Sequence, residues 1–293
     1  MAVLRSITPL DVFFLGSVTL LLGGGLAYRV GREDVARALA GPAWAAFSAF
    51  WLVTAVTFLR DSRTFLGLVG LVTVAVAGYA TTLVVRRRHP GPQLTVAFGV
   101  MAALFVTFEF VEPVYRFGLT SVAAHTAWSL SVAGFEPVIT QSSQGYATGV
   151  TFLGAPLGHG IRLVSACSGI SAITLFVGLI SASDAPLRKR VVASVSVAVV
   201  IYALNVIRTT FVAGSIAGQW FAAVAGPVSA LYGVSDPGLV SYYVAEYVLA
   251  QILVVVVLLG VYRVLTVFVP ELEALVDGVL DAAVADLEDA VQR

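Results

Sequence analysis

The sequence predicts an all-α fold, a polytopic transmembrane helix bundle. Of its 293 residues, 59% are hydrophobic and only 12% are charged, against about 25% charged residues in an ordinary soluble domain. The apolar residues form long runs, and a run of about 20 apolar residues is enough to cross about 30 Å of hydrocarbon. The formal net charge is zero, so no basic surface argues for nucleic acid as a partner.

We expect about seven membrane spans, some of them short. The qualifying stretches are residues 11–29, 42–59, 64–85, 94–112, 166–182, 191–213 and 239–262. The first stretch could be mistaken for a secretion signal, but it is long enough to span and has no small-x-small cleavage site at its end, so we interpret it as a retained span. The stretch 114–134 is interrupted by Arg116 and His125, and we expect it to be interfacial or re-entrant.

The positive residues predict an outer N-terminus and a cytoplasmic C-terminus. If 114–134 does not cross, the clusters at 29–37, 86–88 and 188–190 fall on one side, and loops rich in Arg and Lys stay in the cytoplasm. The helix that carries Arg208 then enters from the cytoplasm near Val191. At about 1.5 Å per residue, Arg208 lies about 26 Å across, near the outer surface.

An outer segment precedes the fifth span. Two β-branched runs, Thr148–Leu153 and Ile161–Ser165, are separated by a stretch rich in Gly and Pro, which is typical of a short hairpin. This extracytoplasmic hairpin would hold the residues that follow it at the membrane surface.

The last residues predict an acidic amphipathic helix. Apolar residues recur at helical spacing over 270–293, with acidic residues between them. Anionic lipid disfavours an acidic helix, so we expect it to pack against protein, with a homo-oligomer through this helix as one candidate arrangement. The predicted domains are a transmembrane domain over 1–265 and a cytoplasmic helix over 266–293.

Cys167 is the only cysteine, and it stands where a polar stretch runs into an apolar helix. A buried lone cysteine is usually a small hydrophobe, which is the simpler interpretation. At the start of a helix, however, free backbone N–H groups and the helix dipole lower the pKa of a thiol. Ser168 and Gly169 leave room for a substrate backbone. Cys167 is therefore a candidate nucleophile.

Arg208 lies in the apolar helix after that, and a charge in such a place needs a reason. One reason is that the side chain reaches for lipid headgroups from the end of the helix. Asn205, three residues earlier, shares its helical face, and a face turned to lipid would not favour a second polar residue. Opposite a thiolate, Arg208 could stabilise that anion or a developing oxyanion.

These two motifs resemble those of a known family. The Ala-Cys-Ser-Gly-Ile stretch at 166–170 and the Asn-x-x-Arg at 205–208 look like the signature of the exosortase and archaeosortase family of membrane transpeptidases. The resemblance covers roughly residues 120–263, and residues 241–247 look most like the archaeosortase A branch.

The resemblance implies a substrate and a reaction. Members of the family recognise a C-terminal sorting tail, which includes a transmembrane helix, on secreted surface proteins. They cleave near its signature, and they are thought to transfer the new C-terminus to a membrane lipid. Carried over to this chain, Cys167 is the nucleophile and Arg208 stabilises the oxyanion or thiolate. We expect Ser168, Gly169 and Asn205 to contact the substrate, in a multi-pass protein of the cell membrane whose active site faces outward.

The chain departs from the family at one position. The family has a third basic residue, His or Arg, near the outer end of the last span, and this sequence has none there. By position, Tyr247 and Glu246 stand in its place. Tyr can donate a hydrogen bond, and a buried Glu can act as a base. His159, eight residues before Cys167, is a further candidate base, although a surface-loop histidine usually has no such role.

Two other hypotheses stay open. In the first, the protein is a transporter or a membrane scaffold, Arg208 binds an anionic solute and Cys167 only packs. In the second, the chain is a catalytically impaired member of the family, because the third cation is missing. The sequence has no metal-ligand cluster, phosphate loop or nucleotide fingerprint, so we expect no metal and no cofactor.

Overall fold

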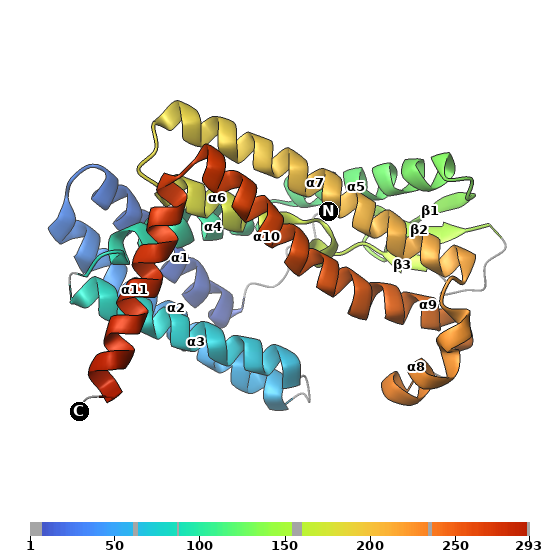
Figure 1. The fold of residues 1–293 in the computed structure, drawn as a ribbon, viewed down its shortest axis with the longest axis horizontal. Helices are drawn as coiled ribbons and strands as arrows, with labels where there is room; N and C mark the ends of the chain where they lie inside the picture. Colours follow the sequence, from blue (N-terminus) through green and yellow to red (C-terminus); the bar gives the residue numbers. More distant parts are fainter. Residues whose placement is uncertain (1–7, 61–63, 87, 154–159, 234–235, 292–293) are drawn as a thin grey trace. The chain divides into compact units, whose positions relative to one another are not determined.

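The computed structural model describes residues 8–60, 64–86, 88–153, 160–233 and 236–291. They form the predicted all-α membrane fold with one small sheet (Figure 1). The helices up to the sheet are α1 (Pro9–Arg29), α2 (Glu33–Arg60), α3 (Thr64–Val85), α4 (Gly91–Phe110) and α5 (Glu112–Val132). After the sheet come η1 (Ser165–Cys167), α6 (Ile170–Ala182), α7 (Leu187–Gly218), η2 (Ala222–Val224), α8 (Ala225–Tyr232), η3 (Pro237–Leu239), α9 (Val240–Tyr243), η4 (Val244–Leu249), α10 (Ala250–Phe268) and α11 (Glu271–Val291).

Six helical stretches within the described residues are long and apolar enough to cross a membrane. They are α1, α2, α3, α4, α7 and the continuous run Pro237–Phe268, and each matches a predicted span. The span predicted at 166–182 is the exception, because α6 has 13 residues and at about 1.5 Å per residue reaches only about 20 Å. Helix α5 is not among the six, as expected for 114–134.

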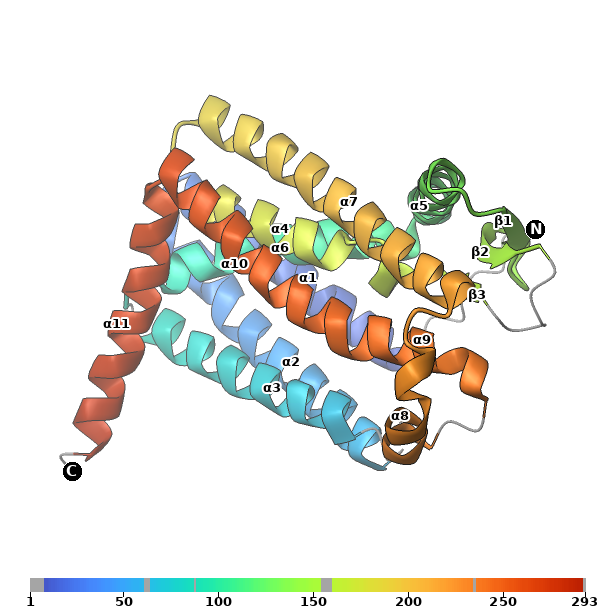
Figure 2. The same cartoon turned by 45° about the vertical axis from the view of Figure 1, so that its right-hand side comes forward.

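The chain divides into two compact units. The first unit comprises residues 1–106, 174–194 and 265–293, and the second comprises 107–173 and 195–264. In the first unit, α2 packs against α1 on one side and α3 on the other (Figure 2). The boundary predicted from the sequence, between a transmembrane domain over 1–265 and a cytoplasmic helix over 266–293, stays a prediction.

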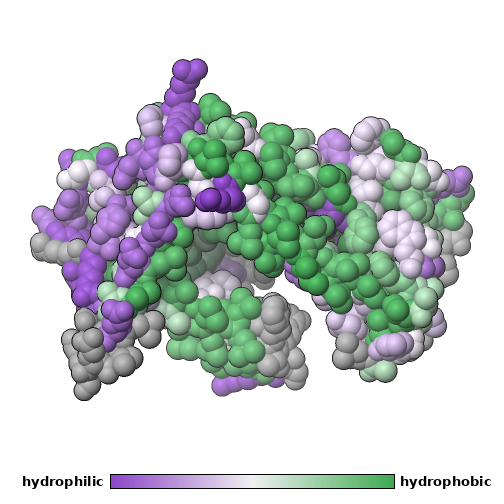
Figure 3. All heavy atoms as spheres, in the orientation of Figure 1, coloured by the Kyte–Doolittle hydropathy of each residue, from purple (hydrophilic) through white to green (hydrophobic). Residues whose placement is uncertain are grey.

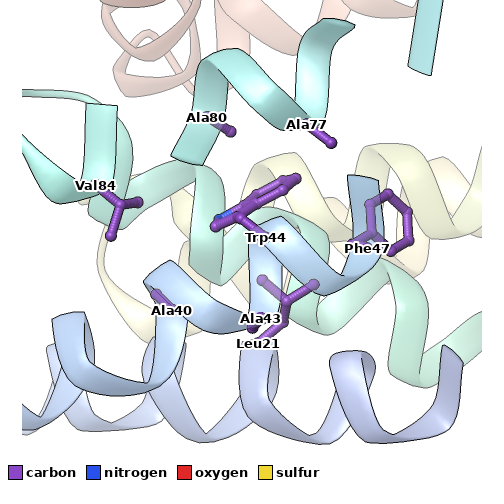
Figure 4. Packing of buried hydrophobic residues seen from close by; sticks show 8 residues of the cluster. All are labelled: Leu21, Ala40, Ala43, Trp44, Phe47, Ala77, Ala80 and Val84. Carbon is purple, nitrogen blue, oxygen red and sulfur yellow. The ribbon is translucent and has the colours of Figure 1, made fainter. Parts of the chain in front are cut away.

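The core of the first unit is built from aromatic and small side chains. Figure 4 shows the Trp44 ring with Leu21 of α1 on one side and Ala77 and Ala80 of α3 on the other. Small residues let helices approach closely in a membrane, where packing rather than the hydrophobic effect drives association. The Trp44 indole N–H donates to the Thr95 hydroxyl at 3.0 Å, so this buried donor is satisfied.

Helix α11 confirms the predicted C-terminal amphipathic helix, and it packs within its own chain. Leu272 and Leu275 are buried, while hydrophilic side chains cover much of its outer side (Figure 3). The Lys189 ammonium lies 3.1 Å from the Glu271 carboxylate, and Arg88 pairs with Asp286. Association with a second copy through this helix stays a prediction.

The second unit holds a three-stranded antiparallel sheet in the order β1-β2-β3. The strands are β1 (Pro137–Gln141), β2 (Ala147–Phe152) and β3 (Gly160–Arg162). Strands β2 and β3 are the predicted hairpin, with Val150 opposite Ile161, whereas β1 was not predicted. Helix α5 packs against β1 and β2 (Figure 1).

Strand β3 leads directly into the candidate nucleophile. Val150 and Leu163 are buried with Val122 of α5 and Ala213 of α7, and Cys167 packs against this cluster. The sheet therefore packs with α5 and with the turn that carries Cys167. On the same unit, α10 presents a continuous hydrophobic surface (Figure 3), as expected for a helix that faces lipid.

Candidate active site

Cys167 lies in a tight turn, not at the first residue of a helix. It ends the 3₁₀ turn η1, and α6 begins three residues later at Ile170. The Cys167 N–H donates to the Val164 carbonyl at 2.7 Å. Between turn and helix, Gly169 has a φ of +75°, a left-handed conformation that glycine adopts without strain.

Ser168 holds this turn together. Its hydroxyl donates to the Ser165 carbonyl at 2.6 Å and accepts from the Ile170 N–H at 3.2 Å, so it caps the start of α6 as serine commonly does. The side chain is buried. The Ser168 hydroxyl therefore makes both of these hydrogen bonds inside the turn. The expected contact between Ser168 and a substrate stays a prediction.

Asn205 on α7 fixes the same turn from the other side. Its Nδ2 donates to the Cys167 carbonyl at 2.6 Å, and the residue is 8% exposed. A Cβ atom on Gly169 would lie 3.2 Å from the Asn205 Cβ, so the glycine also permits this close approach. Asn205 thus positions the turn in this structure, whereas the sequence suggested a contact with substrate.

A cavity of about 180 Å³ brings the reactive groups together. Its lining includes Cys167 from η1, Arg208 from α7, and Tyr242 and Glu246 from the last span. Residues 160–163, in and just after β3, complete much of the remaining wall. The sulfur and the guanidinium, far apart in the sequence, therefore line one cavity within the second unit.

Arg208 forms an ion pair with Glu246 in this cavity. Their side chains are only 13% and 19% exposed, so neither charge could be buried cheaply without the other. Glu246 lies in η4, a π-helical segment, and such segments are frequent at functional sites because they displace side chains from the regular helical position. Among the residues that the structure describes, the buried Arg208 Nε has no hydrogen-bond partner.

The environment of Cys167 opposes ionisation of its thiol. Burial raises the pKa of the Cys167 thiol, the Glu246 carboxylate raises it further, and the Val164 backbone contact and Arg208 oppose these effects. The expected lowering by a helix start and a guanidinium is therefore outweighed, since the thiol precedes the helix and Glu246 offsets the charge of Arg208. A thiolate would need either a base at the moment of reaction or a change in the Arg208–Glu246 pair.

Tyr247 lies beside the cavity rather than in its wall. It is 52% exposed, and its ring stacks on Tyr243 with the ring centroids 5.4 Å apart. Tyr242 contacts both rings, and it lines the cavity itself. Sequence reasoning missed Tyr242, although its place four residues before Glu246 puts the two on one helical face. His159 lies outside the described residues.

The chain is similar over most of its length to known membrane proteins. The family described as transmembrane exosortase matches residues 10–235. Archaeosortase A of Haloferax volcanii is 32% identical over 273 residues, which cover 88% of this chain and 89% of the relative. Archaeosortase A of Natronomonas pharaonis is 34% identical over 260 residues, which cover 86% of this chain and 82% of the relative. No solved structure matches the chain.

Proposed function

This chain belongs to the transmembrane exosortase family, and from that membership we propose that it is a cysteine transpeptidase that sorts secreted surface proteins. The family assignment and the membrane-spanning helices make it a membrane protein of the protein-sorting class. Its substrates are secreted proteins with a C-terminal sorting tail. The acceptor of the new C-terminus is a membrane lipid, and the reaction takes place on the extracytoplasmic face.

The convergence of Cys167, Arg208 and Glu246 on one cavity carries the proposal. Cysteine is the strongest common nucleophile among protein side chains once ionised, and the two charged neighbours offer a proton acceptor and an oxyanion partner. A transporter that only used Arg208 to hold an anion would not need a thiol in the same cavity, nor a buried carboxylate that competes for the guanidinium.

The reaction begins when the sorting tail enters the cavity. Its scissile carbonyl approaches Cys167, and the Arg208 guanidinium shifts from Glu246 toward the carbonyl oxygen. The thiol proton passes to the Glu246 carboxylate as the sulfur forms a bond to the carbonyl carbon. The resulting oxyanion is held by Arg208, whose planar fork of donors suits a developing negative charge.

Collapse of this intermediate breaks the C–N bond of the peptide. The leaving amine takes the proton from Glu246, and the new C-terminus stays on Cys167 as a thioester. A nucleophilic group of the lipid head then attacks the thioester and loses its proton, the C–S bond breaks, and the thiol is restored. A water-poor cavity favours this transfer over hydrolysis.

The test is processing of a tailed surface protein by Cys167→Ala and Cys167→Ser. Both variants are expected to leave the precursor unprocessed, because serine at this position has no strong base to activate it. Processing is followed by the loss of precursor mass in membranes. Ser143→Ala, an exposed change in the turn between β1 and β2, serves as the control and should process normally. Full processing by both Cys167 variants contradicts the proposal.

The absence of the family's third cation suggests a separate test of whether the chain is catalytically impaired. The variant Tyr247→Arg places a cation at the position where the family has its third basic residue. If the unaltered chain is active, this variant should gain little. A large gain in processing, from an undetectable starting level, would instead support the impaired-member hypothesis.

A further inference from the structure

A second cavity, of about 220 Å³, lies in the first unit where α1 and α3 end and α2 and α4 begin. No residue of the candidate active site lines it. Its polar lining includes Tyr28, Glu33, Arg37, Arg88, His89 and Gln93.

Gln93 is the strongest sign that something binds here. The residue is 6% exposed, its Nε2 lies 3.0 Å from the His89 Nε2 and 3.4 Å from the Tyr28 hydroxyl, and its Oε1 has no partner among the described residues. If the amide is turned around, the Nε2 takes the place without a partner. Either way a buried polar atom at this cavity lacks a hydrogen bond, which folded proteins rarely tolerate.

The charges around the cavity define what would fit. Arg37 pairs with Asp34, and Arg88 pairs with Asp286, yet each guanidinium has five N–H donors and a single carboxylate does not use them all. Glu33 adds a carboxylate to the same lining. A bare anion would meet these carboxylates, and an apolar molecule would leave Gln93 unsatisfied. A phosphate ester whose alcohol carries a hydrogen-bond donor suits both kinds of group: its phosphate accepts from the guanidinium groups, and its alcohol donates to the carboxylate.

The position of the cavity suits a lipid. It lies at the helix ends beside Arg37 and Arg88. These belong to the basic segments that the positive-inside rule assigns to the cytoplasmic side, where anionic headgroups attract basic residues. Leu26, Val35 and Val85, near the same helix ends, are exposed and would contact acyl chains. We propose that this cavity binds a phosphate ester with a hydroxyl-bearing alcohol, as in the headgroup of a phosphatidylglycerol-type lipid.

Native mass spectrometry of the full-length protein tests this inference. Phosphatidylglycerol is added as the probe, and phosphatidylcholine, whose headgroup has no hydrogen-bond donor, is the comparison. Phosphatidylglycerol adducts should survive gas-phase activation about tenfold better, because a charge-assisted contact is worth about that factor. Equal survival of the two lipids overturns the proposal.

Matched variants locate the binding site. Arg37→Gln and Gln93→Leu should each reduce phosphatidylglycerol retention about tenfold. Arg32→Gln removes an exposed cation near the same helix ends that does not line the cavity, and its retention should not change. If Arg32→Gln lowers retention as much as Arg37→Gln, binding reflects surface charge and the proposal fails.

Two further measurements complete the test. Tyr28→Phe removes one hydroxyl without changing the shape of the ring and should lower retention about threefold. If Tyr28→Phe and Arg37→Gln both bind as the unaltered chain does, the proposal is overturned even where Gln93→Leu does not fold. Excess glycerol 3-phosphate distinguishes the two possible ligands. If it displaces phosphatidylglycerol, the cavity binds a soluble phosphate ester, and if it does not, the cavity binds a membrane lipid.

Discussion

At the scale of single residues, Asn205 connects the helix of the candidate oxyanion partner to the turn of the candidate nucleophile. Its Nδ2 donates to the Cys167 carbonyl at 2.6 Å, and Arg208 follows one helical turn later on α7. A displacement of about 1 Å can cost a reaction about a hundredfold, even when the change lies away from the reacting atoms. The position of Cys167 therefore depends on an amide that takes no part in the chemistry.

We predict that Asn205→Ala lowers the rate constant of processing about tenfold to a hundredfold. The apparent KM for a tail substrate should change less, because the variant displaces the sulfur rather than the binding surface. The measurement is single-turnover processing of a tailed substrate. The matched control is Thr210→Val, which removes a buried hydroxyl that has no partner among the described residues and should process normally. Equal rates in the two variants would remove the positioning role.

The Arg208–Glu246 pair allows a second residue-scale prediction. Arg208→Met leaves the Glu246 carboxylate buried without its partner, and such a change typically costs about 3–5 kcal/mol. Adding Glu246→Gln removes that charge, so the double variant should regain most of the lost thermal stability. It should nevertheless process no substrate, since both the oxyanion partner and the proton acceptor are absent.

Thermal unfolding and the processing assay together decide this cycle. Recovered stability with no processing assigns the Arg208–Glu246 pair to the chemistry. Recovered stability together with recovered processing would show that the pair is structural, and no recovery of stability would show that the two charges do not depend on each other. Glu246→Gln alone should stay folded, because glutamine can still accept from Arg208.

The cavity residues also show how far sequence reasoning reaches at this scale. Cys167, Arg208 and Glu246 could be selected because each is a reactive or charged group in an apolar setting. Ile161 could not, because the hairpin meets the last span only through a long-range contact that has no local sequence signal. Tyr242 was missed although it shares a helical face with Glu246. The function of Asn205 also escaped prediction, since nothing in an Asn-x-x-Arg motif says whether the amide faces a substrate or a backbone carbonyl.

At the scale of elements, α11 is held to the first unit by partly exposed ion pairs. The hydrogen bond from Arg88 is the main cause that holds the pKa of Asp286 below its ordinary value. The pKa of Glu271 is also lowered, first by a backbone N–H and then by Lys189. A carboxyl whose pKa is lower in the docked helix stabilises docking above its ordinary pKa, and this contribution disappears as pH falls through the lowered value.

We therefore predict that α11 detaches at acid pH. Its amide protection, corrected for intrinsic exchange, should stay constant from neutral pH to about pH 5 and fall below about pH 4, given ordinary values of about 3.9 and 4.3 for Asp and Glu. Hydrogen exchange with mass spectrometry measures this, with α1 as the internal reference. Asp286→Asn should already lower protection at neutral pH, and Asp281→Asn, an exposed change on the same helix, should not. A flat profile for α11 contradicts the prediction.

The elements differ in how well the sequence predicted them. The long spans were predictable because length and hydropathy alone define them. Strand β1, which reads Pro-Val-Ile-Thr-Gln, is too short and too polar at its end to show a clear alternation, and only its pairing with β2 makes it a strand. The π-helical segment η4 has no sequence signature either, since Val244–Leu249 would fit a regular helix equally well.

At the scale of the whole molecule, the direction of the chain through the membrane decides which solutions the two cavities meet. With an outer N-terminus, α1 brings Arg32 to the cytoplasm, and α2, α3 and α4 carry the chain back to the outer side. If α5 does not cross, the sheet with Ser143 lies outside together with the turn of Cys167. If α5 does cross, Arg32 and Ser143 share one side. The side on which the sheet and Cys167 lie thus depends on α5.

We predict that a membrane-impermeant maleimide distinguishes these two arrangements in intact cells. In a Cys167→Ala background, Ser143→Cys should be labelled from outside, while Arg32→Cys should be labelled only after permeabilisation, because both positions are exposed but face opposite solutions. Labelling of both after permeabilisation confirms that each thiol is reachable. Protection of both in intact cells would mean that α5 crosses. If the short α6 crosses as well, the Arg188–Arg190 cluster would then lie outside, against the distribution of charge that positive-inside sorting produces. The active site would in that case open to the cytoplasm, where secreted proteins with sorting tails do not accumulate, so this measurement also tests the extracytoplasmic reaction that we propose.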